Sequence, residues 1–364
     1  MFRITRVVRG SVVSLCVAVA ACAAPTASQV APSPSVTSRP SAPAVSAPAA
    51  SAPAASDSVE PTGPPTVGLD ESASLDLDLD GGPDWPMELD GSLWVLAPDA
   101  EEPFVYHIDP ESGEEQARIT VGGRLCQGMV SGFDALWVCA DDGAIRIDPA
   151  TNSVVANIGF TAARAFARLV VSEDAVWSLA GNVVPNTVVR IDPATNAVTA
   201  TYPLGHVAAG LSYGSGALWA TSAADGLLLR IDPQNGEVTT AVADLPAPIS
   251  VATGAGSVWV VLYGPDGPAP SLSDPALLRY DAATGGSTLL DIGSHPGGAA
   301  DIVANDDAVW VRGSEPFIVR LDPATGEIAW AVSHRGTGDG SIGLAAGWLW
   351  ATSVDFGSVW RLDP

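Results

Sequence analysis

The chain has 364 residues and a formal net charge of -25 at pH 7, with 41 acidic residues against 16 basic ones, all of them arginine. A surface this negative repels phosphate backbones and anionic lipid headgroups. The composition therefore excludes nucleic acid as an expected partner, and the length allows one large domain or two ordinary ones.

Residues 1–21 have the features of an export signal. Three arginines in the first nine residues precede an apolar run, residues 11–21, that is too short to span a bilayer. The run ends in Val-Ala-Ala followed by Cys22, which resembles the lipobox of bacterial lipoproteins. We expect a lipoprotein signal peptide at 1–21 and an exported protein attached to the membrane only through a lipid on Cys22. Ordinary cleavage near Ala23, without a lipid, is the alternative.

Residues 22–70 form the next segment. Most residues from Ala23 to Ser56 are Ala, Pro or Ser, and Arg39 is the only charged one. Such a composition cannot bury enough apolar surface to offset its ordering entropy, and its prolines favour extended conformations. We expect a disordered linker, acting either as a stalk that holds a domain away from the membrane or as a plain spacer.

A strictly alternating segment follows at residues 74–80, Ser-Leu-Asp-Leu-Asp-Leu-Asp. This pattern predicts a strand with leucines inward and aspartates in water. Asp76, Asp78 and Asp80 also resemble the start of an EF-hand loop, but the twelfth position is Met87, and Glu88 comes one residue late. We therefore expect a strand here and no calcium.

A Leu/Val-Trp pair occurs seven times, with 40 to 51 residues between successive tryptophans. Each pair is followed by a segment related to Arg-Ile-Asp-Pro, and each unit reads as four short strands. Radial repetition of four-stranded sheets at this period is typical of a β-propeller. The tryptophans are Trp94, Trp137, Trp177, Trp219, Trp259, Trp310 and Trp350.

The predicted fold is thus an all-β, seven-bladed propeller of four-stranded antiparallel blades over residues 71–364. The last unit ends at Pro364 after its third strand, so the segment at 74–80 is expected to complete it and close the ring. Asp-Pro-Ala-Thr-Asn/Gly repeats mark the turns between third and fourth strands. Their aspartates are expected to form turns, and the repeated arginines to bond neighbouring blades.

Cys126 and Cys139 flank the turn at Gly132-Phe133-Asp134 almost symmetrically. An antiparallel hairpin would place them face to face, and outside the cytoplasm such a pair can oxidise. We expect a disulfide rather than a metal pair, because no histidine is nearby in sequence.

The loops from the fourth strand of one blade to the first strand of the next should surround the mouth of the ring. They contain cations that could focus a positive spot on a negative body and hold a carboxylate or sulfate. The alternative is that scattered loop charges do not converge. The proposed ligand-binding residues are Arg124, Arg164, His206, His295 and Arg335; the same loops contain Asp84, Trp85, Pro246 and Asp339.

The pattern of aliphatic-Trp-Val followed by Arg-Ile-Asp-Pro-Ala-Thr-Gly/Asn resembles the YVTN-type propellers and the propeller of the streptogramin (virginiamycin B) lyases, over about residues 73–364. The lyase resemblance implies a metal-assisted site with a histidine and a Glu-x-His pair. No histidine here has a glutamate two residues before it, and His107 stands at the arginine position of the repeat, so the activity is not carried over.

We expect the protein to act as a non-enzymatic binding or scaffold module, without a cofactor. We also expect it to be a monomer. Its ligand is expected to be an anionic small molecule, a wall component or a protein. The alternative is a metal-dependent lyase or hydrolase that uses His206, His295 and carboxylates such as Asp339.

Overall fold

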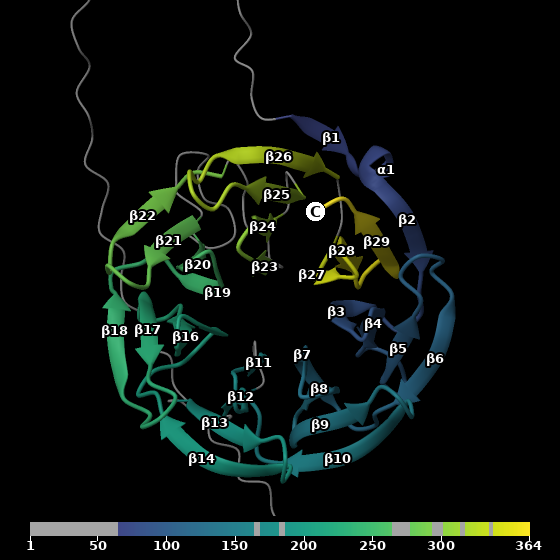
Figure 1. Ribbon diagram of the computed structural model, residues 1–364, viewed down its shortest axis with the longest axis horizontal. Coiled ribbons are helices and arrows are strands. Elements are labelled where there is room, and N and C mark those ends of the chain that lie inside the picture. The colour runs from purple at the N-terminus through teal and green to yellow at the C-terminus, as the bar shows by residue number, and fades with distance from the viewer. Residues whose placement is uncertain are drawn as a thin grey trace, which may run out of the picture. The chain divides into compact units, whose positions relative to one another are not determined.

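Seven antiparallel sheets surround a central axis in the computed structural model (Figure 1). The structure describes residues 65–163, 168–181, 186–263, 277–292, 301–313, 317–334 and 338–364. Each sheet runs from an innermost strand at the axis to a strand at the rim. Every innermost strand packs on the next one, and that of the last blade packs on that of the first. The predicted seven-bladed propeller is confirmed.

The strands are given for each blade from the axis to the rim. Blades one to three contain β3 (Asp84–Leu89), β4 (Ser92–Ala97), β5 (Phe104–Ile108) and β6 (Glu115–Thr120); β7 (Leu125–Gly132), β8 (Ala135–Ala140), β9 (Gly143–Asp148) and β10 (Ser153–Gly159); β11 (Leu169–Val171), β12 (Val176–Ala180), β13 (Thr187–Asp192) and β14 (Ala197–Pro203). Blades four and five contain β15 (Gly210–Gly214), β16 (Ala217–Ser222), β17 (Leu227–Ile231) and β18 (Val238–Val242); β19 (Pro248–Gly254), β20 (Ser257–Leu262), β21 (Leu277–Asp281) and β22 (Ser287–Leu290). Blades six and seven contain β23 (Asp301–Ala304), β24 (Val309–Arg312), β25 (Ile318–Leu321) and β26 (Ile328–Ser333); β27 (Ile342–Ala345), β28 (Trp348–Ser353), β29 (Ser358–Leu362) and β2 (Ala73–Asp78).

Strand β2 completes blade seven from the N-terminal side, as the sequence predicts. It pairs antiparallel with β29, with Leu77 opposite Val359. Its residues alternate between half-buried and exposed, so the leucines face the blade and Asp76 and Asp78 face solvent. The ring is therefore closed by strands from both ends of the propeller sequence.

The folded region begins before the predicted boundary at residue 71. Strand β1 (Thr66–Gly68) pairs parallel with β26 and adds a fifth strand to blade six, and the one-turn helix α1 (Leu69–Ser72) leads into β2. Leu69 is buried, which gives this segment an apolar anchor that a disordered linker lacks. The described part of the chain has no helix long and apolar enough to cross a membrane.

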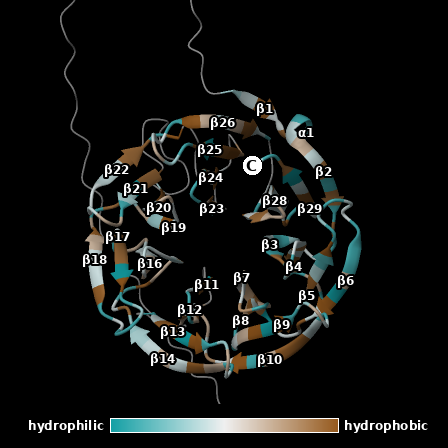
Figure 2. Ribbon diagram, viewed as in Figure 1, coloured by the Kyte–Doolittle hydropathy of each residue, from teal (hydrophilic) through white to brown (hydrophobic). Residues whose placement is uncertain are grey.

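The second strand of each blade carries the repeat tryptophan, and all seven of these rings are at most 2% exposed. The second strand of a blade is covered on both faces by the neighbouring blades, which explains why its residues are apolar on both faces. The buried indole N–H still needs an acceptor: Trp137 and Trp219 donate to the carbonyls of Gly132 and Gly214, each at 3.0 Å. Figure 2 shows the same division, with hydrophobic colouring on β8 and mostly hydrophilic colouring on the rim strand β6.

The repeat aspartates shape the turns between third and fourth strands. The Asp192 carboxylate accepts the backbone N–H of Ala194 at 2.8 Å, and Asn196 takes a positive φ of 54°. Hydrogen bonds from Ala194 and Thr195 hold the pKa of Asp192 below its usual value. The prediction that these aspartates are turn formers is confirmed.

Three of the repeat arginines, Arg146, Arg279 and Arg361, donate hydrogen bonds to the next blade, whereas Arg190 bonds Asp174 and Thr199 of its own blade. Nη1 of Arg146 donates to the carbonyl of Pro193 at 2.7 Å and to the Asn196 side chain at 3.0 Å, and its guanidinium lies over Trp137. Arg361 reaches from blade seven to the Pro110 carbonyl of blade one in the same way. The predicted bonding between blades is therefore present, as hydrogen bonds to turn carbonyls.

His107 takes the arginine position in blade one. It stacks on Trp94 with ring centroids 3.9 Å apart and bonds Asn152 of blade two. Its role is structural.

Replacing Arg146 by Ala is expected to lower the free energy of unfolding by about 1–3 kcal/mol, because it removes three charge-assisted hydrogen bonds and a cation–π contact. Urea unfolding followed by tryptophan fluorescence measures the loss. Arg230→Ala is the matched control, since Arg230 occupies the same repeat position but is exposed. Equal effects of the two substitutions would contradict a bonding role for Arg146.

Candidate functional site

Arg124 lies in the predicted loop, between β6 and β7. Its side chain is 80% exposed, and Nε lies 3.8 Å from the Asp141 carboxylate on the same blade. The pair is therefore a loose surface ion pair, of a kind that contributes little to stability.

His206 also lies in the predicted loop, between β14 and β15. Its Nδ1 bonds the Asp225 carboxylate at 2.9 Å, within blade four, and this hydrogen bond lowers the pKa of Asp225. Arg124 and His206 thus each have an acidic partner on their own blade. The other three proposed ligand-binding residues lie outside the described residues: Arg164, His295 and Arg335.

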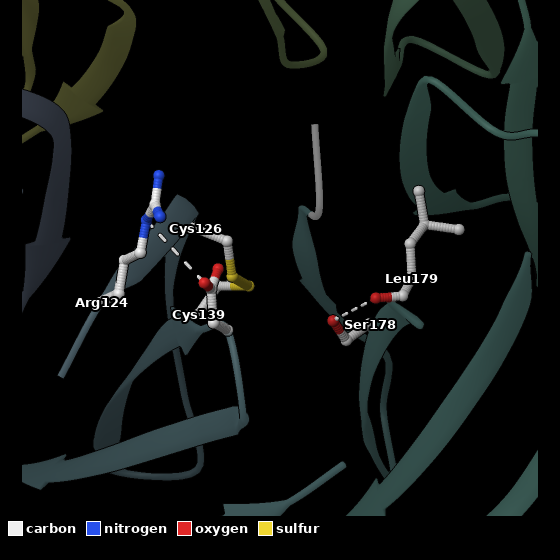
Figure 3. The surroundings of a disulfide bond; sticks show 6 residues. Arg124, Cys126, Cys139, Ser178 and Leu179 are labelled. Atoms are coloured by element: carbon white, nitrogen blue, oxygen red, sulfur yellow. Dashed lines mark hydrogen bonds and ion pairs between the residues drawn. A yellow bond between two sulfur atoms is a disulfide. The ribbon is translucent and has the colours of Figure 1, made fainter. Parts of the chain in front are cut away.

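Cys126 and Cys139 are joined by a disulfide between β7 and β8, with their Cα atoms 5.2 Å apart (Figure 3). The register of this hairpin shifts between Met129↔Val138 and Leu125↔Ala140. Without that shift Gly128 would face Cys139, so the irregularity in β7 brings Cys126 opposite its partner. Figure 3 shows Arg124 beside this bond.

Reduction of this disulfide is expected to lower the free energy of unfolding by about 2–3 kcal/mol, because the bond closes a short loop in the unfolded chain. Urea unfolding with and without reductant measures the change, in a Cys16→Ala, Cys22→Ala background in which no other thiol responds. Intact-mass analysis that finds two free thiols in the untreated chain would contradict the bond.

A cluster of polar side chains occupies the axis at the end where the fourth-to-first-strand loops meet. Its members stand at, or one residue from, the start of the innermost strands of blades one, three, six and seven. These strands surround the centre of Figure 1. We call this set the axial cluster: Asp84, Trp85, Arg168, Asp301 and Ser341.

An ion pair crosses the ring within the axial cluster. Nη2 of Arg168, from blade three, donates to the Asp301 carboxylate of blade six. The Arg168 side chain is 16% exposed and that of Asp301 is 5% exposed. The same carboxylate accepts the backbone N–H groups of Ile302 at 2.8 Å and Ile342 at 3.1 Å, so it is held by two blades before it meets the arginine.

Trp85 of blade one completes this bridge. The Arg168 guanidinium lies over the Trp85 ring, 4.7 Å from its centroid. Trp85 has a positive φ of 52°, which is uncommon for a bulky residue and costs of order 1–3 kcal/mol. Its backbone N–H donates to Asp84 and to Ser341, bonds that hold the strained residue in place.

Asp84 is the second buried carboxylate of the cluster. It accepts hydrogen bonds from the hydroxyls of Ser341 and Thr352 across the seam between blades one and seven. Burial raises the pKa of Asp84 to about 6, with a further contribution from the nearby Asp301, although the bonds from Ser341 and Trp85 oppose the shift. The positive charge of Arg312, itself 1% exposed, also opposes the rise in the pKa of Asp84.

Sequence reasoning placed Asp84 and Trp85 in the mouth loops but did not select them, and it missed Arg168, Asp301 and Ser341. One usable signal is Asp301, an acid that begins an apolar innermost strand. The Arg168–Asp301 contact joins residues 133 positions apart, and no local pattern reports it.

Within the described ranges, no group of three His, Cys, Asp or Glu side chains is arranged to hold a metal ion. The metal-dependent alternative needed His206 and His295: the first bonds Asp225, and the second lies outside those ranges.

Comparison with known proteins identifies the fold alone. The sequence matches no protein-family model and no curated protein. The structure is similar to Kuenenia stuttgartiensis hydrazine synthase (TM-score 0.63, 12% identity, 80% of this chain and 97% of that one). It is also similar to the Neurospora crassa Pan2 WD40 domain (TM-score 0.60, 11% identity, 78% and 90%) and to a chain of a mitotic checkpoint complex (TM-score 0.61, 13% identity, 80% and 95%).

Proposed function

We propose that this chain is an exported, lipid-anchored β-propeller that binds a ligand, without catalysis, on the loop face around the axial cluster. The ligand would be an anionic small molecule, a wall component or a protein, and the chain would act as a monomer. The lipid on Cys22 and the linker would keep this binding face outside the membrane. The resemblance to YVTN-type propellers fits such a role.

The observation that supports the proposal is the axial cluster itself. Charged side chains from separate blades are buried at the axis, where apolar packing of similar volume would often be as stable or more so. A strained tryptophan and a carboxylate with a raised pKa lie in the same place, and such features concentrate at functional sites. A purely structural ring does not need them.

A ligand screen on the purified full chain tests the proposal. Anionic metabolites and soluble wall fragments would be compared by thermal shift, and hydrogen exchange would locate any protection. We expect a ligand that stabilises the chain, protects the starts of β3, β11 and β23, and is recovered unchanged. Chemical turnover of that ligand would contradict the non-enzymatic role, and protection confined to the opposite face would contradict the site.

The anchor has a separate test. Labelling with a fatty acid in cells should mark the wild-type chain and not the Cys22→Ala variant, and the variant should leave the membrane fraction. Equal membrane association of both chains would contradict lipid attachment.

A further inference from the structure

Arg168 has hydrogen-bonding capacity that the ring does not use. A guanidinium carries five N–H donors in a planar fork. Only Nη2 is engaged, by Asp301, and among the described residues neither Nε nor Nη1 has an acceptor. The side chain is 16% exposed, so part of it remains accessible to solvent.

Trp85 adds a second unused donor at the same place. Its indole Nε1 is buried and, within the described part of the chain, has no hydrogen-bond partner. A buried donor without an acceptor costs about 1–3 kcal/mol. The indole ring of Trp85 lies against the Arg168 guanidinium, so the unused donors of the two side chains are close together.

The charges of this region limit what can bind to the donors. Arg168 and Arg312 only balance Asp84 and Asp301, so the buried region has no net positive charge to hold a multiply charged anion. What can hold one negative charge there is the set of unused donors on Arg168 and Trp85. Acids on the surrounding loops, such as Asp141 and Asp225, repel molecules with several negative charges. The ligand that fits these limits is a small molecule with a single negative charge and with acceptor oxygens in one plane.

We propose that Arg168 and Trp85 form the binding site for a small monocarboxylate at the axis of the propeller. A carboxylate offers two coplanar oxygens that match the guanidinium fork, and a further lone pair can accept the indole N–H. Asp301 holds the guanidinium from its other side and fixes its plane. The inference rests on the proposed binding function and names the ligand class and the residues for it.

Calorimetric titration of the full chain with acetate, propionate and benzoate tests the site, with chloride at matched ionic strength and acetamide as the uncharged analogue. We expect carboxylate binding and no acetamide binding. Arg168→Gln should weaken binding at least about tenfold, and Trp85→Phe, which removes only the indole N–H, by about three- to tenfold. Arg168→Lys keeps the charge but not the fork, and should fall between wild type and Arg168→Gln.

Two further variants separate binding from folding. The double variant Arg168→Gln, Asp301→Asn removes the ion pair without leaving a buried unpaired charge, and it should also lose binding while keeping the near-ultraviolet circular dichroism of the wild type. Arg230→Gln, at an exposed arginine outside the axial cluster, should bind as the wild type does.

The outcomes distinguish this inference from the proposed function. Undiminished carboxylate binding in Arg168→Gln and Trp85→Phe, or an equal loss in Arg230→Gln, would overturn the axial site and leave a binding face elsewhere. Failure of all three carboxylates to bind the wild-type chain would also overturn it. A different ligand found by the screen and protected at the starts of β3, β11 and β23 would still support the proposed function.

Discussion

A chain that begins at Gly81 is expected to lose about 5 kcal/mol of unfolding free energy, which is a large part of the stability of an ordinary domain. Its seventh blade would keep only three strands. The unpaired edge of β29 would be exposed, and edges of this kind favour aggregation.

The size of this effect follows from where the β2 leucines lie. Leu75 and Leu77 are half-buried in a cluster that contains Val359 of blade seven and Tyr106 of blade one. These leucines therefore contact both blades, and their loss would weaken the packing between blade seven and blade one. The Tyr106 hydroxyl also donates to the Asp80 carbonyl, which fixes the chain as it leaves the strand.

Urea unfolding of nested truncations measures the contribution of β2. A chain beginning at Pro65 is the reference, one beginning at Ala73 lacks only β1 and α1 and should lose about 2–3 kcal/mol through Leu69, and one beginning at Gly81 should lose most. Asp78→Ala, on the exposed side of β2, should change little.

Addition of the missing strand in trans provides a second test. A peptide of residues 73–80 should raise the stability of the chain that begins at Gly81 by adding a strand to β29. A peptide in which Leu and Asp exchange places should not, because every side chain would face the wrong side. Equal urea midpoints for the chains beginning at Pro65 and Gly81 would show that β27 against β3 closes the ring without β2.

Most of the fold was predictable because its determinants are local and repeated. The turn at Asp192-Pro193, the apolar strand around Trp177 and the alternation at 74–80 each specify a backbone conformation within a few residues. In blade three the repeat tryptophan Trp177 lies on β12, and the Arg190-Ile191-Asp192 segment ends β13. Repetition then makes one unit predict the others.

The extra elements before residue 71 were not predictable in this way. Strand β1 has three residues, all exposed, and it exists because Ala331 and its neighbours in β26 offer an unpaired edge. The burial of Leu69 depends on the seam between blades six and seven. Neither feature has a periodic signature in the sequence.

The candidate site was the least predictable part, for a related reason. Arg124 and His206 lie in loops between the fourth strand of one blade and the first strand of the next, but loop position could not show that acids of their own blades pair with them. Arg168, Asp301 and Ser341 meet only because the starts of innermost strands converge at an axis. Such convergence depends on the closed ring rather than on any segment.

Replacement of Asp84 by Asn is expected to stabilise the protein at neutral pH by up to about 3 kcal/mol. The pKa of Asp84 is raised from 3.8 to about 6, because burial disfavours the charged carboxylate. Since the folded pKa exceeds the unfolded one, the stabilising contribution is fully present below pH 3.8 and is lost as the pH rises through 6. Asparagine keeps the shape and the acceptor oxygen but does not ionise.

The measurement is the difference in unfolding free energy between wild type and Asp84→Asn from pH 3.5 to 8. This difference should be close to zero below pH 4, grow between pH 4 and 6, and level off above pH 6.5. Asp78→Asn, at an exposed carboxylate, should show no such window. Two results would contradict this prediction: a difference that does not depend on pH, or a variant less stable than wild type at pH 8. Either would mean that Arg312 and the hydroxyls of Ser341 and Thr352 stabilise the charged form of Asp84. Stabilisation in the expected window would instead show that the charged Asp84 carboxylate lowers the stability of the wild-type protein. A residue that lowers stability at a site is often retained because the site binds a ligand.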